Sequence, residues 1–206
     1  MELLTERFFS PKKNCLRIIA ATVVFAVVLL ASFSCAEKMS DEEARTILAE
    51  LVPLSQELNE TFWGDFLPLA NPDATPLESV SGGQYYPVAD DAKYRTVADL
   101  KTAAEAVFTA DYLAGVYSMA FEGTGSNENR IYPRFSEDEN GVLAINITHK
   151  IFDFKTEVKP ETARVTERGS GYIRCTVDTL YDGEPREMRI TLRNQNGTWL
   201  LDSPTY

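Results

Sequence analysis

The feature that most constrains the fold of this chain is a change of hydrophobic period near Arg130. Before it, apolar residues recur every three or four positions, the spacing that gathers them on one face of a helix. After it, apolar and polar residues alternate, as in strands with one buried face. Helices that come first and strands that follow predict an α+β domain, with about three helices packed on a curved antiparallel β-sheet.

The first helix is expected to begin at a capping box. Ser40 and Glu43 have the capping-box spacing, and an apolar stripe follows them as far as Phe62. Pro53 lies inside this stripe, and a proline in a helix interior removes a hydrogen bond and clashes with the preceding turn. We therefore expect the helix to kink or split near Val52.

Two further helices are expected after a long loop. Residues 68–92 are rich in proline and glycine and have no sustained period, apart from a short strand expected at Gln84–Val88. Thr96 with Asp99 is a capping-type pair for the second helix, and Thr109 is the expected N-cap of the third.

An antiparallel meander is expected in the second half. The dipeptides Asp182-Gly183 and Asn196-Gly197 lie between alternating runs and predict hairpins. Apolar residues that alternate in these strands, including Phe152, Phe154, Ile173, Val177, Ile190 and Leu192, are expected on the inner face. The expected strands are Ile131–Phe135, Leu143–Ile147, Phe152–Val158, a short one at Ala163–Val165, Ile173–Thr179, Met188–Leu192 and Trp199–Asp202.

The N-terminus is predicted to direct export. Ile18–Ser34 carries no charge, basic residues precede it and acidic residues follow it, which places the rest of the chain outside the cytoplasm. Residues 1–35 are thus expected to be a signal peptide or a membrane anchor helix, and 36–206 a single domain on the extracytoplasmic side of a bacterial cell membrane. Small residues precede Cys35, so this region resembles a lipoprotein signal with Cys35 as the lipid-attachment site. Ordinary cleavage nearby and an uncleaved anchor are the alternatives.

Charge and cysteine content limit the partners. The net charge of −11 argues against nucleic acid and anionic lipid surfaces as partners. It suits a basic protein, a cationic ligand, or solubility alone. Of three cysteines only Cys175 lies within the expected domain, so no disulfide can form inside it, and a buried structural thiol is expected there.

The sequence contains no recognisable catalytic or metal-binding motif. His149 is the one histidine, whereas zinc sites use several His or Cys ligands. Glycine-rich phosphate loops and the G-x-S-x-G motif do not occur. We therefore predict no catalytic residues, no metal and no cofactor, and a role other than catalysis.

Two kinds of surface are candidates for binding a partner. Paired tyrosines next to Pro87 are typical of interfaces, although they would equally pin the loop onto the core. Acidic residues at two expected hairpin tips are candidate contacts with a basic partner, and solvated tips are the alternative. The candidate contacts are Tyr85, Tyr86, Glu137, Asp138, Glu139, Asp182 and Glu184.

Several stretches resemble a known family. They are TFWGDFLP (61–68), YYPV (85–88), YRTVADLKTAAEAVFTADYL (94–113) and RIY (130–132). Together they resemble the bacterial IseA-type DL-endopeptidase inhibitors, and the helices followed by a bent sheet resemble the nuclear-transport-factor-2-like and cystatin-like cone folds. The resemblance implies a non-catalytic cell-surface protein that binds and restrains peptidoglycan endopeptidases. It carries over no functional residue.

Two other functions remain open. A cone fold of this kind would also suit a lipoprotein that holds a small apolar molecule between sheet and helices. An isomerase or hydratase on the same scaffold is a weaker alternative, because the inner strand positions hold apolar residues and no carboxylate. A cavity of several hundred cubic ångströms would favour the ligand-binding protein.

Overall fold

The computed structural model describes residues 39–206 except 66, 72, 74, 78–82, 126–129, 150–151 and 154. The expected export segment Ile18–Ser34, the candidate lipid site Cys35 and the core candidate Phe154 lie outside the described residues. In the part that is described, no helix is long and apolar enough to cross a membrane.

Helix α2, Asp41–Trp63, runs along the centre of the molecule. Both hydrogen bonds of the capping box between Ser40 and Glu43 are present, which confirms the expected start. The expectation that Pro53 splits the helix is wrong, because α2 continues through it. Pro53 lies on the exposed side, where water can hydrogen-bond the carbonyl group left without a helical partner.

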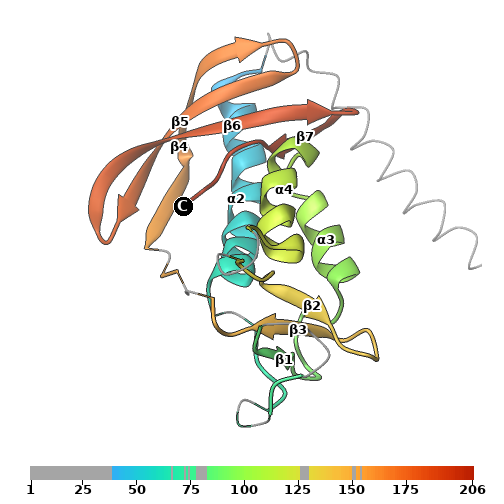
Figure 1. Ribbon diagram of the computed structural model, residues 1–206. Coiled ribbons are helices and arrows are strands. Elements are labelled where there is room, and N and C mark those ends of the chain that lie inside the picture. The colour runs from blue at the N-terminus through green and yellow to red at the C-terminus, as the bar shows by residue number, and fades with distance from the viewer. Residues whose placement is uncertain are drawn as a thin grey trace, which may run out of the picture.

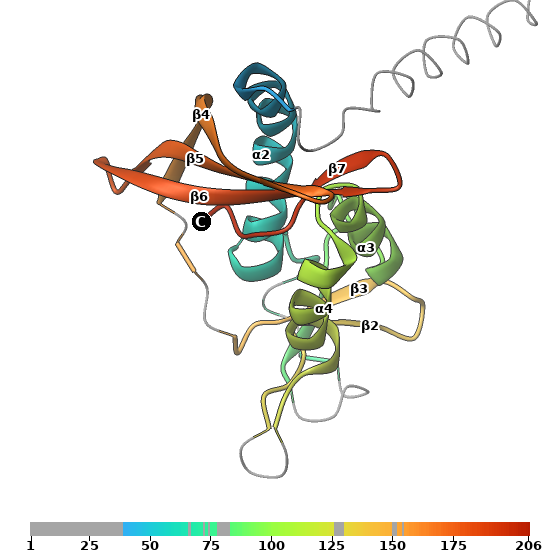
Figure 2. The same ribbon diagram turned by 90° about the horizontal axis from the view of Figure 1, so that it is seen from above.

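The other helices lie beside α2. Helix α3 spans Val97–Glu105 and has a complete capping box between Thr96 and Asp99. Helix α4 spans Ala110–Tyr117, begins at the N-cap Thr109 as expected, and passes into the π-helical turn η2, Ser118–Glu122. Figure 2 shows α3 and α4 together on one side of α2.

The strands form two antiparallel sheets, which corrects the expectation of a single curved sheet. The strand order is β1-β3-β2 in one sheet and β4-β5-β6-β7 in the other. The two sheets lie at opposite ends of the helices (Figure 1). The strands are β1 Tyr85–Pro87, β2 Phe135–Glu137, β3 Leu143–Asn146, β4 Thr156–Gly169, β5 Tyr172–Tyr181, β6 Glu184–Gln195 and β7 Thr198–Leu201.

Three expected strands differ from those observed. β2 begins only at Phe135, and Ile131 instead forms an isolated bridge with Thr124. The strand expected from Phe152 begins at Thr156, and the short strand at Ala163–Val165 is part of the long β4. Pro160 is tolerated in β4 because it lies at the sheet edge, inside a register shift between Lys159 and Arg164.

The core is one cluster of buried apolar residues that joins α2, α3 and α4 to both sheets. Ile173, Val177, Ile190 and Leu192 have no exposed surface, so their expected inward placement is confirmed. Phe152 is 51% exposed, which corrects its expected place in the core. It lies before β4 begins, so no neighbouring strand fixes which way its side chain points.

Candidate functional site

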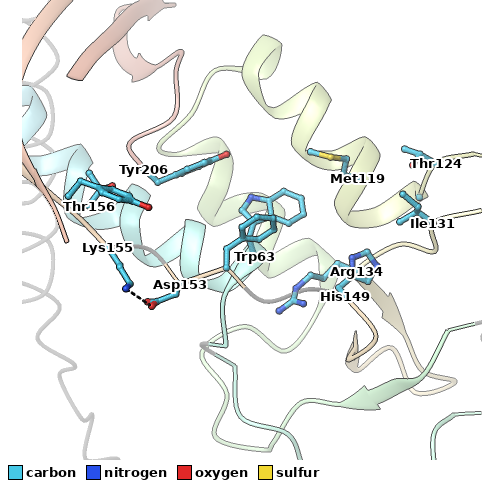
Figure 3. A pocket seen from close by; sticks show the side chains of 13 residues that line it. Trp63, Met119, Thr124, Ile131, Arg134, His149, Asp153, Lys155, Thr156 and Tyr206 are labelled. Carbon is cyan, nitrogen blue, oxygen red and sulfur yellow. Dashed lines mark ion pairs between the residues drawn. The ribbon is translucent and has the colours of Figure 1, made fainter. Parts of the chain in front are cut away.

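A cleft of about 460 Å³ opens where segments from both halves of the molecule meet. One wall comes from Met119 in η2 and from Ile131. The opposite wall comes from Phe152, Asp153, Lys155 and Thr156, at and just before the start of β4, and from Tyr181 and Tyr206. Figure 3 shows Trp63 between these walls. Two smaller pockets, of about 350 and 50 Å³, also lie on the described part of the chain.

Exposed apolar side chains gather around this cleft. Seven large hydrophobic residues of the described chain are strongly exposed, and five of them line the cleft. Scattered exposed hydrophobic residues are normal on protein surfaces, but a contiguous group marks a site where something binds. The five are Met119, Ile131, Phe152, Tyr181 and Tyr206, between 44% and 58% exposed.

A glycine shapes one edge of the cleft. Gly123 follows η2 with a φ of 74°, the left-handed region that favours glycine. A Cβ atom at this position would lie 2.4 Å from the carbonyl oxygen of Ile131. The backbone therefore approaches closely here, and Thr124 and Ile131 pair through two backbone hydrogen bonds of 2.9 and 2.7 Å.

The inner end of the cleft contains a buried cation. Arg134 is only 4% exposed, and its Nη2 donates a hydrogen bond to the carbonyl oxygen of Gly64. Gly64 is the C-cap of α2, where the partial negative charge of the helix end favours a cation. The backbone carbonyl of Arg134 accepts from the amide of Asn146 at 2.8 Å, which fixes the residue next to the three-stranded sheet.

The charge of Arg134 is only partly compensated. Among the described residues it forms no ion pair, and its Nε is buried without an acceptor. Burial lowers the pKa of Arg134, and the more distant Asp65 carboxylate opposes this shift. An arginine nevertheless stays protonated in proteins, so the cleft has a permanent positive charge at its inner end.

His149 lies beside Arg134 in Figure 3, and both also line a second, smaller pocket. Its Nε2 is 2.6 Å from the carbonyl oxygen of Tyr132. A carbonyl can only accept, so Nε2 carries a proton, and a neutral ring then presents Nδ1 as an acceptor. His149 therefore adds a second polar group to the wall that contains Arg134.

The outer rim contains exposed charges. The Nζ atom of Lys155 lies 3.7 Å from a carboxylate oxygen of Asp153 and 3.5 Å from one of Asp182. These carboxylates, Asp182 first, raise the pKa of Lys155. The pairs are solvent-exposed, so each contributes little to stability. The rim thus combines one cation with two carboxylates, while the inner end is positive.

The tyrosines predicted as partner contacts are not on the surface. Tyr85 is fully buried and Tyr86 is 8% exposed, so both pack the loop onto the core, the alternative that the sequence left open. The hydroxyl group of Tyr85 donates to the carbonyl oxygen of Pro133 at 2.7 Å. Because Pro133 precedes Arg134, this bond helps to hold the segment that carries the buried cation.

The acidic candidates lie in two separate turns. Glu137 accepts from the Val97 amide at 2.9 Å, next to the N-terminus of α3, and Asp138 accepts from two amides of its own turn. These two carboxylates therefore have structural partners, whereas Glu139 and Glu184 are exposed. Asp182 pairs with Lys155 at the cleft rim. The described residues contain no group of three or more His, Cys, Asp or Glu side chains arranged to hold a metal ion.

Strand β5 contains the cysteine predicted to be buried. Cys175 is fully buried with a free thiol, as expected, and burial is the main reason that its pKa rises to about 11. Asp178 is 3.2 Å from Arg164 on the neighbouring strand β4.

Sequence reasoning missed the residues that form the cleft. Trp63, Arg134 and Phe152 lie far apart in the sequence and share no motif. Arg134 follows the quoted stretch at 130–132, but nothing in the local pattern distinguishes a buried arginine from an exposed one. Only the packing of α2 against the segment before β2 reveals its burial.

Comparisons with known proteins add no assignment. No protein-family model matches the sequence, and no curated protein matches it significantly. The cleft combines apolar walls, a positive inner end and a volume suited to a small organic molecule.

Proposed function

We propose that this protein is a non-catalytic binding protein whose cleft holds a small organic molecule with an apolar part. The observation that carries the proposal is the gathering of five exposed hydrophobic side chains around one cleft of about 460 Å³. Ligand pockets are commonly about 300–1,000 Å³ in volume and mostly apolar, with a few polar groups. Of the functions considered from the sequence, the small-molecule-binding lipoprotein fits this geometry best.

We also infer that the fold of this domain is related to the nuclear-transport-factor-2-like and cystatin-like cone folds. The packing of α2 on β4 of a four-stranded antiparallel sheet supports it. The second, three-stranded sheet lies outside that simple scheme.

The proposed location is the extracytoplasmic side of a bacterial cell membrane, with residues 1–35 as signal or anchor and Cys35 as the lipid carrier. The uncharged run and the basic residues before it support this location. Mass spectrometry of the intact protein extracted from membranes tests whether Cys35 carries a lipid. A diacylglyceryl mass on a chain that begins at Cys35 is expected, and an unmodified mass that includes residues 1–34 would contradict it.

Binding can be tested with 4-phenylbutanol, a water-soluble probe with an apolar body. The full chain in detergent is titrated, and the fluorescence of Trp63 is followed against a detergent blank. We expect saturable binding, and a Trp63→Phe variant should lose the signal. No saturable change above the blank, confirmed by calorimetry, would refute a ligand-binding cleft.

A matched pair of variants locates the probe. Ile131 lines the cleft and Leu54 does not, yet both are about half exposed, at 58% and 47%. Ile131→Ser should weaken binding roughly fivefold, because the probe would cover the remaining apolar surface of that side chain, worth about 1 kcal/mol. Leu54→Ser should bind normally, and equal effects of the two variants would place the probe elsewhere.

Restraint of a peptidoglycan endopeptidase is the second candidate function. Support comes from the family resemblance and from the net charge of −11, which suits a basic enzyme. The test is digestion of cell walls by the host's endopeptidases with and without a several-fold molar excess of the protein. Slower digestion is expected, and an unchanged rate for every enzyme would count against inhibition.

A further inference from the structure

We propose that Arg134 forms an oxyanion subsite, so that the ligand of the cleft is an amphipathic molecule with an apolar body and a carboxylate or phosphate head. This inference rests on the proposed function and names its ligand class. At the inner end of the cleft, the nearly fully buried guanidinium of Arg134 forms no ion pair with any described residue.

Among the described residues, most N–H donors of the Arg134 side chain have no acceptor. A guanidinium has five N–H donors, and in the described structure the side chain of Arg134 makes one hydrogen bond, to the carbonyl oxygen of Gly64. The large majority of buried side-chain polar atoms in proteins have a partner. A buried Nε without an acceptor, in a residue that forms no ion pair among the described residues, therefore points to an acceptor outside them.

Arg95 provides an internal comparison. Its Nε is also buried without an acceptor, but its Nη1 lies 3.0 Å from the Asp90 carboxylate. The charge of Arg95 is thus paired within the protein. Among the described residues, the charge of Arg134 interacts with the C-terminal end of α2 and with the more distant Asp65. The missing partner at Arg134 is an anion.

The cleft lies where that anion would have to enter. Arg134 and His149 line the 460 Å³ cleft, and Figure 3 shows them next to each other near Trp63. An oxyanion can accept two hydrogen bonds from a planar guanidinium, a pairing that carboxylates and phosphates share. His149 would face the same head group, and its Nδ1 can donate to an anion when the ring is protonated.

The walls define the rest of the ligand. Beyond the charged end, the lining consists mainly of Trp63, Met119, Ile131, Phe152 and Tyr181. These side chains can bury an apolar chain or ring but offer few polar groups. A fully hydrophilic anion would leave this surface exposed, and an uncharged apolar molecule would leave Arg134 without its partner. An amphipathic oxyanion satisfies both ends.

The test compares four probes with one apolar body: 4-phenylbutyrate, 4-phenylbutyl phosphate, 4-phenylbutanol and 4-phenylbutylamine. Calorimetry on the full chain in detergent, with a matched blank, gives each Kd. We expect at least one of the two anions to bind tenfold or more tightly than the alcohol, since hydrogen bonds to charged groups are the stronger ones. The amine should bind more weakly than the alcohol, and the tighter anion identifies the head group.

The Arg134→Gln variant assigns the preference to this residue. Glutamine keeps an N–H donor for the Gly64 carbonyl but has no charge. The anion should then bind this variant about as weakly as the alcohol does. An anion preference that persists in this variant would overturn the assignment to Arg134.

The wild-type comparison alone keeps the proposal falsifiable if the variant does not fold. Equal affinity for anions and alcohol, or tighter binding of the amine, would overturn the oxyanion subsite and leave the binding cleft intact. No binding of any probe would refute the binding cleft itself.

Discussion

A buried hydroxyl network joins the C-terminal segment to helix α2, and replacing Thr205 with valine tests it. Thr205 is fully buried, and its Oγ1 lies 2.7 Å from Ser55 Oγ and 3.1 Å from Asn59 Nδ2, which donates to it. Ser55 uses its single hydroxyl proton for the carbonyl oxygen of Val52, at 2.8 Å. Thr205 must therefore donate to Ser55 and accept from Asn59.

Valine has nearly the shape of threonine but can make neither bond. In Thr205→Val the amide of Asn59 loses its acceptor and Ser55 loses its donor, while both remain buried. An unsatisfied buried group costs about 1–3 kcal/mol, so the free energy of unfolding should fall by roughly 2–3 kcal/mol. Thr205→Ser keeps the hydroxyl group and loses one methyl group, which should cost only about 1 kcal/mol.

Urea unfolding of the two variants at 25 °C distinguishes these effects. With a slope of about 1–3 kcal/mol per molar urea, the valine variant should unfold at a midpoint about 1 M or more below wild type. A double-mutant cycle with Asn59→Ala should show a coupling of roughly 0.5–3 kcal/mol. If valine is tolerated as well as serine, or if the cycle is additive, the hydroxyl network does not hold the C-terminal segment in place.

Three further measurements test other parts of the fold. Pro53→Ala should stabilise the protein by about 1–3 kcal/mol, because the exposed proline costs α2 one hydrogen bond, and a lower urea midpoint would contradict this. Burial raises the pKa of Glu57, but hydrogen bonds from Lys93 and Tyr94 lower it below 4.5. The stability gained from the ionised carboxylate is therefore present above pH 4.5 and is lost as the pH falls through the lower folded pKa. Glu57→Gln should be destabilised at pH 7, and its difference from wild type should disappear in acid. Cys175, with its pKa raised to about 11, should react with a thiol reagent only as fast as the protein opens, and rapid labelling of the native state would show that the thiol is accessible.

The parts of the fold that the sequence predicts correctly depend on interactions between near neighbours in the chain. The capping box of Ser40 with Glu43 needs only residues three apart, and it forms as expected. The hairpin turns behave in the same way, because Asp182 and Asn196 adopt positive φ angles of 53° and 54° that suit asparagine or aspartate before glycine. Local preferences agree with the final structure at these positions.

The division into two sheets could not be predicted in this way. Alternation shows that a segment is extended, but it does not show which strand pairs with which. The segment from Leu143 pairs with β1 and β2, whereas the segment from Thr156 pairs with β5. The residues between them join the two sheets, so Phe152 alternates like a core residue and yet lies at the surface.

The same limit applies to the candidate site. Arginine is usually exposed and tyrosine is intermediate, yet Arg134 and Tyr85 are both buried. Their burial follows from contacts that are distant in sequence: Tyr85 bonds to Pro133, and Arg134 bonds to Gly64.

The C-terminal end of α2 explains why a buried cation and exposed aromatic residues meet in one cleft. The carbonyl of Gly64 accepts from Arg134, and the carbonyl of Trp63 accepts from the amide of Phe152 at 3.0 Å. The last carbonyl groups of a helix lack helical partners, so two neighbouring acceptors are available there for segments from elsewhere in the chain. One of them holds a guanidinium at the inner end of the cleft, and the other holds the connection between the sheets at its wall. The helix end that completes the fold thus also assembles the site.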